Sequence, residues 1–162
     1  MYVPADIKAR IVQILKDGIA KAEARYNIKL PFPKVTYEQG GARIAGTASY
    51  RKWTIDFNPG ILMHNVEQFL GDTVLHELGH LVCDKVYPEA HASNIAFSYT
   101  TGRYKRTKRD VHGARWQECT RACGHPNPTR CHDMDTKALK VAAGGGQWYC
   151  TCGCGKKTTV GA

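Results

Sequence analysis

The sequence predicts a domain that combines helices with a group of short strands. Residues 5–26 carry isoleucine and leucine at helical spacing, with lysines and arginines between them. Residues 35–60 alternate in polarity, are rich in Val, Thr, Tyr, Trp and Ile, and contain glycines at turn positions, which is typical of two or three short strands. Residues 61–70 and 73–84 are again helical in pattern. A length of 162 residues suits one domain with a small appendage.

The segment Thr73–Asp84, TVLHELGHLVCD, contains the pattern H-E-x-x-H. On a helix, His76 and His80 lie one turn apart on the same face, where both can bind one metal ion. Glu77 lies beside them and suits the role of general base in zinc-assisted hydrolysis. The apolar residues lie on the side away from the histidines, which predicts a helix with separate core and chemical faces: Leu75, Leu78, Leu81 and Val82.

A catalytic zinc ion usually has three protein ligands and one open position. The candidates for the third ligand are the other histidines and two acids: His64, His91, His112, His125, His132, Glu89 and Glu118. His112 is favoured because it precedes a predicted helix that ends near Gly124, far enough along the chain to return to the first two ligands. His125 and His132 lie in or beside the cysteine-rich tail, where a structural metal could bind them.

The net charge of +9 and the pI of about 9.3 favour a polyanionic partner, of which nucleic acid is the common one. Residues 103–110, RYKRTKRD, gather five cations around an aromatic side chain: Arg103, Tyr104, Lys105, Arg106, Lys108 and Arg109. This composition suits phosphate contact with base stacking. A solvated loop is the alternative, and the two interpretations are compatible. We therefore expect DNA as a partner.

The composition also bears on location. No apolar run approaches 18 residues, so we expect no membrane span. The first residues, MYVPADIKARIVQ, lack the apolar segment of a signal peptide. Seven cysteines without a secretion signal are typical of a reducing compartment, with thiols free or bound to metal. These features predict a cytoplasmic, DNA-associated protein, and we expect a monomer.

Three segments, IDFNPGIL, FLGDTVLHELGHLV and HGARW, resemble in this order the SprT-like family of zinc metallopeptidases, which includes the Spartan proteases. The resemblance covers about residues 5–125. It implies an α+β, zincin-like fold with a small antiparallel sheet packed on the H-E-x-x-H helix. It also implies that His76, His80 and His112 bind a catalytic zinc ion and that Glu77 is the catalytic base. For the Spartan branch of the family, it implies that the substrates are proteins bound or crosslinked to DNA.

The tail departs from the family. We expect a metallopeptidase domain at residues 1–126 and a cysteine-rich tail at residues 127–162, a partial zinc ribbon. YCTC at residues 149–152 resembles the start of the family's zinc ribbon, but no second cysteine pair follows it. The candidate ligands of a second, structural zinc ion are Cys131, Cys150, Cys152 and Cys154, and His132, Cys119 or Cys123 could add to them. Cys119, Cys123 and Cys83 are also candidates for packed thiols.

The residues favour a zinc-dependent endopeptidase, and two other functions compete with it. One is a non-catalytic, zinc-stabilised nucleic-acid-binding module, for which the basic charge and the tail are the main features. Glu77 argues against it, because a structural site needs no acid there. The other is a metal hydrolase that acts on nucleic acid. The sequence leaves three donors open for stabilising an oxyanion: Tyr99, Tyr104 and Arg115.

Overall fold

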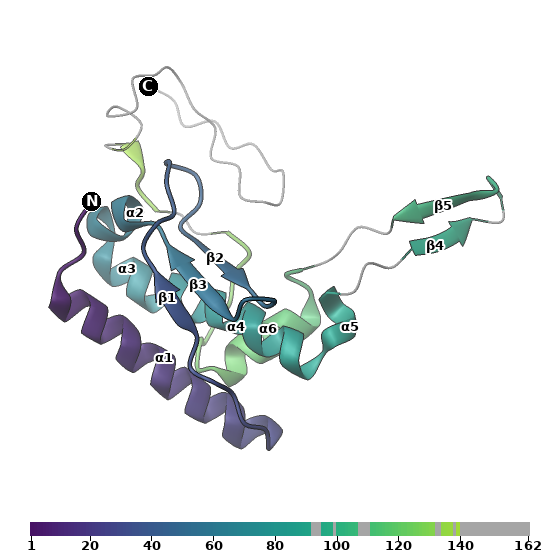
Figure 1. Cartoon of the computed structure of the whole chain (residues 1–162), viewed down its shortest axis with the longest axis horizontal. Coiled ribbons are helices and arrows are strands. Elements are labelled where there is room, and N and C mark those ends of the chain that lie inside the picture. Colours follow the sequence, from purple (N-terminus) through teal and green to yellow (C-terminus); the bar gives the residue numbers. More distant parts are fainter. Residues whose placement is uncertain (92–94, 99, 107–110, 132–133, 138, 140–162) are drawn as a thin grey trace.

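The computed structural model describes residues 1–91, 95–98, 100–106, 111–131, 134–137 and 139. Figure 1 shows a small sheet with a long helix below it, shorter helices behind it, and a separate two-stranded hairpin. The long helix packs directly on the shorter ones. The helices are α1 (Ala5–Tyr26), α2 (Pro59–His64), α3 (Val66–Gly71), α4 (Thr73–Val86), α5 (Pro88–His91) and α6 (Ala114–Ala122). The strands are β1 (Lys34–Thr36), β2 (Gly46–Ser49), β3 (Thr54–Phe57), β4 (Ile95–Ser98) and β5 (Arg103–Arg106). This mixture of helices and strands confirms the α+β part of the prediction.

Helix α1 has the bounds that the sequence predicts. Its buried side is the apolar stripe, Ile7, Ile11, Leu15, Ile19 and Ala22, and each fully buried leucine or isoleucine contributes about 1.5–3 kcal/mol to folding. Gly18 lies on the same side, where a Cβ atom would come within 2.7 Å of the Leu78 side chain, so glycine lets α1 approach α4 closely. Among the described residues, no helix is both long enough and apolar enough to cross a membrane.

The three-stranded sheet has the order β1-β3-β2. Strand β2 is antiparallel to β3, but β1 is parallel to β3, so the sheet is mixed and the expected antiparallel sheet is wrong. The reason lies in the connections. Residues 37–45 carry the chain from β1 to the far edge of the sheet and reverse its direction, and the turn between β2 and β3 reverses it again, which leaves β1 and β3 running the same way.

Helix α4 is the central element of the domain. It packs against α1, α3, α5, α6 and strand β2, and Figure 1 shows it behind the sheet. The apolar side predicted from the sequence is confirmed, because Leu78, Leu81 and Val82 are buried. With neighbours on several sides, α4 holds its remaining face, which carries the two histidines, in a fixed position beside β2.

Asn58 joins the sheet to α2. Its side-chain oxygen accepts hydrogen bonds from the Gly60 and Ile61 amides and so caps α2. Its side-chain nitrogen donates to the carbonyl oxygens of Gly41 (2.7 Å) and Ile44 (3.0 Å). At 2% exposure this amide is buried with its hydrogen bonds made, so Asn58 fixes the loop that precedes β2.

Strands β4 and β5 form an antiparallel hairpin that the sequence analysis did not predict. The register places Phe97 opposite Tyr104 and Ser98 opposite Arg103. Gly102 lies in the turn with φ +63°, a conformation that favours glycine. In Figure 1 the hairpin extends away from the helices, beyond α5 and α6. Half of the basic run predicted to contact DNA is therefore strand β5.

Candidate metal centre

Helix α4 presents His76, Glu77 and His80 toward the space beneath β2. His76 and Glu77 are each 6% exposed, so both polar groups lie almost entirely within the protein. Burying two ionisable groups on a helix is unfavourable unless they are paired or bind a metal. The arrangement therefore fits a functional site better than a solvated helix face.

His112 reaches the same place from the turn before α6. Gly79 makes this possible, because a Cβ atom there would lie 2.0 Å from Thr120 Oγ1 and 3.2 Å from Thr120 Cα. Thr120 is fully buried and donates its hydroxyl to the Trp116 carbonyl oxygen at 2.7 Å. The glycine of H-E-L-G-H thus lets α6 pack directly on α4, and α6 brings the preceding histidine with it.

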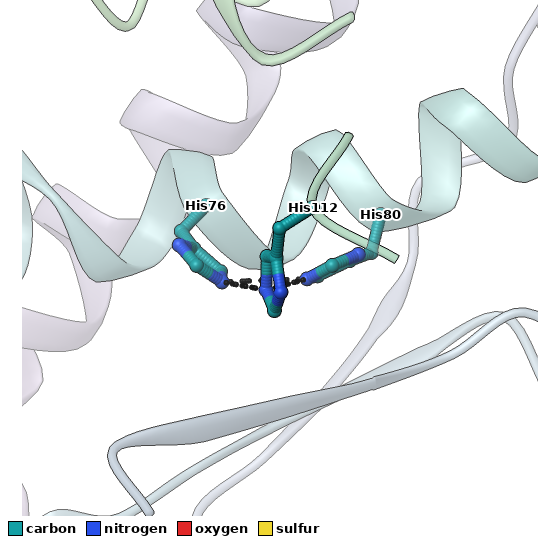
Figure 2. A group of neighbouring side chains, drawn as sticks. All are labelled: His76, His80 and His112. Atoms are coloured by element: carbon teal, nitrogen blue, oxygen red, sulfur yellow. Dashed lines mark hydrogen bonds between the residues drawn. The ribbon is translucent and has the colours of Figure 1, made fainter. Parts of the chain in front are cut away.

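The three imidazoles point at one another through their Nε2 atoms, as Figure 2 shows. The Nε2–Nε2 distances are 3.2 Å for His76–His112, 3.3 Å for His76–His80 and 3.1 Å for His80–His112. Three nitrogens bound to one tetrahedral zinc at about 2.0–2.1 Å would lie about 3.3 Å apart. Each Nε2 carries either one proton or one lone pair, so a closed triangle cannot satisfy all three contacts, whereas a central cation can. The three histidines could hold a metal ion, and the geometry is consistent with zinc.

Trp116 packs against all three histidine rings. Its ring centroid lies 4.7 Å from that of His76, 5.4 Å from that of His80 and 4.8 Å from that of His112. The indole is 2% exposed and stacks on the His80 ring at an interplanar angle of 28°. Fixed rotamers keep metal ligands in their binding geometry, so Trp116 supports the site.

Glu77 lies beside the histidines and against strand β2. A Cβ atom at Gly46 would come within 3.0 Å of Glu77 Cγ, so this glycine leaves room for the carboxylate. Burial raises the pKa of Glu77 to about 8, because desolvation disfavours the ionised form. A divalent cation at the histidines would lower this pKa again. Among the described residues no hydrogen bond or ion pair to this carboxylate is seen, and Glu77 lines the cleft, which leaves its oxygens available to a reactant.

A cleft of about 380 Å³ opens onto these four residues. One wall is residues 42–48, the loop before β2 and most of β2 itself, and the other includes Arg130, Cys131, Met134 and Thr136. Tyr50 is the one tyrosine among the described residues of this lining. The sequence analysis expected strands in residues 35–60 but did not identify the second wall, because its residues are far from the other site residues in the chain and form no motif. Along the sequence, the recognisable motif nearest to residues 42–48 is N-P-G at residues 58–60.

The other candidate ligands lie elsewhere. His64 bonds the Gly60 carbonyl oxygen through Nδ1 at 2.8 Å, and His125 faces Asp72 at 3.4 Å. Glu89 pairs with Arg115, and Glu118 accepts from the Tyr87 hydroxyl at 3.1 Å. The side chain of His91, at the end of α5, and all of His132 lie outside the described part of the structure. Of the candidates that are described, His112 alone meets the first two histidines.

Of the three candidate oxyanion donors, only the side chain of Arg115 is described, and it is not brought to the cleft. Arg115 pairs with Glu89 and lies over the Tyr87 ring at 5.1 Å, and it does not line the cleft. Tyr99 and the side chain of Tyr104 lie outside the described residues.

The cysteines fall into two groups. Cys83, Cys119 and Cys123 are buried, as expected for packed thiols, and burial raises the pKa of Cys123 to about 12. Cys131 is exposed at the cleft, whereas Cys150, Cys152 and Cys154 lie outside the described residues. The second zinc site therefore stays a prediction, as does the division at residue 126.

The basic residues are also described in part. Arg103, Tyr104, Lys105 and Arg106 form strand β5, and Arg103 is exposed. Lys108 and Arg109 lie outside the described residues. Their contact with nucleic acid stays a prediction.

The H-E-x-x-H helix, the third histidine and the cleft define a protein with a candidate metal-dependent active site. The model of the SprT-like family matches residues 15–95, half of the chain, so the chain belongs to the SprT-like family, a family of metallopeptidases. This confirms the resemblance seen in the sequence. The match contains His76, Glu77 and His80 but ends before His112, whose place beside them rests on the geometry.

Curated relatives support the same family. Protein SprT of Shewanella oneidensis is 28% identical over 147 residues, which cover 91% of this chain and 80% of that protein. Protein SprT of Salmonella arizonae is 38% identical over 80 residues, 49% of this chain and 48% of its own length. Protein SprT of Serratia proteamaculans is 34% identical over 80 residues, 49% of this chain and 46% of its own length. The matched part is thus about half the length of the latter two relatives. No solved structure matches the chain.

The close contact of α4 and α6 leads to a prediction for Gly79→Ala. A methyl group there collides with Thr120, so α6 must move away, and we expect a loss of about 1–3 kcal/mol in the free energy of unfolding, measured by urea denaturation. Gly71→Ala is the matched control, because nothing lies within 4 Å of a Cβ atom there and alanine is the better helix former. Equal stability of both variants would contradict the close contact.

Proposed function

We propose that this chain is a zinc-dependent endopeptidase. The observation that carries the proposal is the joint placement of three converging Nε2 atoms and an unpartnered, buried carboxylate at an open cleft. A structural zinc site usually closes its coordination with a fourth protein ligand. Among the described residues no fourth ligand joins the three histidines, and the neighbouring acid faces the cleft.

The roles follow from the positions. His76, His80 and His112 would hold the zinc ion, which when bound lowers the pKa of a water ligand toward about 7 and polarises the scissile carbonyl group. Glu77 accepts the proton of the attacking water and returns it to the leaving amine. Its unpartnered carboxylate is suited to both transfers, since it has no competing hydrogen bond to break.

Strand β2 is suited to hold the peptide. The Asn58 amide donates to the Ala45 carbonyl oxygen at 2.8 Å, which makes Ala45 and its alternate neighbours along β2 the residues that bond to β3. The backbone groups of Gly46 and Ala48 then point to the open edge of the sheet. An extended peptide can pair with such an edge, which would bring its backbone past Glu77 and the histidines.

The basic charge supports a preference for proteins that are bound or crosslinked to DNA. The net charge is +9, and strand β5 carries Arg103, Lys105 and Arg106 on a hairpin that projects from the domain. A hairpin that binds DNA would keep the enzyme beside DNA-bound substrates and so raise their local concentration. The competing function, a nucleic-acid-binding module without catalysis, shares this feature and differs in leaving Glu77 without a role.

The metal assignment predicts that His112→Ala loses zinc. Removing one of three ligands should weaken zinc binding by more than about 100-fold. That factor is the upper end of the loss in metal affinity when a residue that only orients a ligand is removed. Zinc content and affinity are measured by elemental analysis and chelator competition. His64→Ala is the control, because this exposed histidine contacts a carbonyl oxygen of α2. Full zinc affinity in His112→Ala would remove this residue from the site.

The role of Glu77 predicts that Glu77→Gln loses peptidase activity by about 10²–10⁴-fold, since glutamine keeps the shape of the side chain but cannot accept the proton. Zinc content should not change. Cleavage of a DNA-binding protein, followed by gel electrophoresis with and without DNA, measures this. Glu67→Gln is the control, because Glu67 is exposed and pairs with Arg10 on the surface. A Glu77→Gln variant with wild-type cleavage would refute the mechanism.

The basic run predicts salt-dependent DNA binding. Replacing Arg103, Lys105, Arg106, Lys108 and Arg109 with serine should flatten the dependence of log K on log salt by about 3.5 for single-stranded and 4.5 for duplex DNA. DNA-stimulated cleavage should fall as well. The control replaces five exposed cations elsewhere and so removes the same charge: Lys16, Lys34, Arg51, Lys52 and Lys85. Equal losses in both variants would show that total charge, and not the hairpin, determines binding.

A further inference from the structure

The second wall of the cleft comes from the chain beyond α6. Arg130, Cys131, Met134 and Thr136 line the same cleft as the histidines and Glu77. Thr136 is buried at 8% exposure, and Met134 is half-buried against the core. These four residues therefore share the lining of the candidate metal centre with strand β2.

Asn65 fixes this wall. Its side-chain nitrogen donates to the Asp135 carbonyl oxygen at 2.9 Å, and its side-chain oxygen accepts from the Asp135 amide at 3.0 Å. The same nitrogen also donates to the Ile61 carbonyl oxygen in α2 at 3.0 Å. Asn65 thus binds the backbone of residue 135 as a neighbouring strand would, and it ties Met134 and Thr136 to the end of α2.

Helix α2 therefore holds both walls. Asn58, just before α2, bonds the loop that leads into β2, and Asn65, just after it, bonds the opposite wall. Ile61 lies between them and also lines the cleft. Because one short helix fixes both sides, the separation of the walls is set by the fold and not by the ligand.

The space between the walls is largely apolar. Ile44, Ile61, Val111 and Met134 line it, and Glu77 is the one acid among the described lining residues. The apolar part of this surface accepts an apolar side chain, which is removed from water there at no cost in hydration. Arg43 and Arg130 lie in the same lining. Met134 is the largest apolar side chain on the second wall, so its volume limits which apolar side chain fits beside it.

We propose that Met134 determines which substrate side chain is accepted beside the scissile bond. This inference rests on the proposed peptidase function. The wild-type cleft takes an apolar side chain of intermediate size, such as leucine, and excludes larger aromatic ones. Truncating Met134 enlarges the cleft on the side that faces the substrate, and removing the Asn65 clamp loosens the same wall.

The test measures kcat/KM on quenched fluorescent peptides that differ at one residue on either side of the cleaved bond: alanine, leucine or phenylalanine. The ratio of phenylalanine to leucine peptides should rise about tenfold or more in Met134→Ala, the range in which added pocket volume discriminates side chains. Asn65→Asp, which loses both donated hydrogen bonds, should shift the ratio in the same direction. Met63→Ala is the control, because Met63 is half-buried on α2 but does not line the cleft.

Two failures are distinguishable. If the wild-type zinc protein cleaves none of these peptides and no protein substrate, the proposed function fails and the inference fails with it. If peptides are cleaved but Met134→Ala keeps the wild-type ratio, or Met63→Ala changes it equally, the peptidase function stands and the role of Met134 is refuted. If Met134→Ala fails to fold, Met134→Val removes less volume and should still raise the ratio, and a wild-type ratio in that variant would refute the role of Met134.

Discussion

The candidate metal centre depends on the close contact between α4 and α6. Two of its histidines belong to α4 and hold their spacing by helical geometry, but the third precedes α6 and meets them only if the helices pack without an intervening side chain. Gly79 allows this close packing, because the Thr120 side chain occupies the space that a Cβ atom at residue 79 would need. The histidine arrangement is therefore a consequence of backbone packing in the core, and Trp116, on the same helix as Thr120, packs behind the rings.

A second constraint places the acid. Glu77 is buried beside β2 because Gly46 has no side chain and because Asn58 holds the loop before that strand. Removing a carboxylate from water is unfavourable, and the rest of the domain must stabilise the fold against it. The large apolar core shared by α1 and α4 provides this stability. Functional sites commonly keep a reactive group that lowers the local stability of the fold.

Much of the fold could be predicted because it depends on local patterns. The apolar stripe of α1, the alternation around β3 and the H-E-x-x-H helix each identify an element from neighbouring residues. His112 could be selected because it precedes a recognisable helix. The mixed sheet was missed because strand direction depends on long-range pairing. The hairpin of β4 and β5 was missed because residues 95–106 mix polar and apolar residues without a clear period. Asn58 and Asn65 were missed because their partners lie in distant segments.

The position of Trp116 has an optical consequence. Its indole is buried and touches all three imidazole rings, so its emission depends on the electronic state of these rings. Of the other two tryptophans in the sequence, Trp53 lies just before β3 and donates its Nε1–H to the Pro31 carbonyl oxygen, and Trp148 lies outside the described residues. The protein thus contains an intrinsic chromophore at its most reactive point, and occupancy of the histidine cluster can be followed by ultraviolet fluorescence without a label.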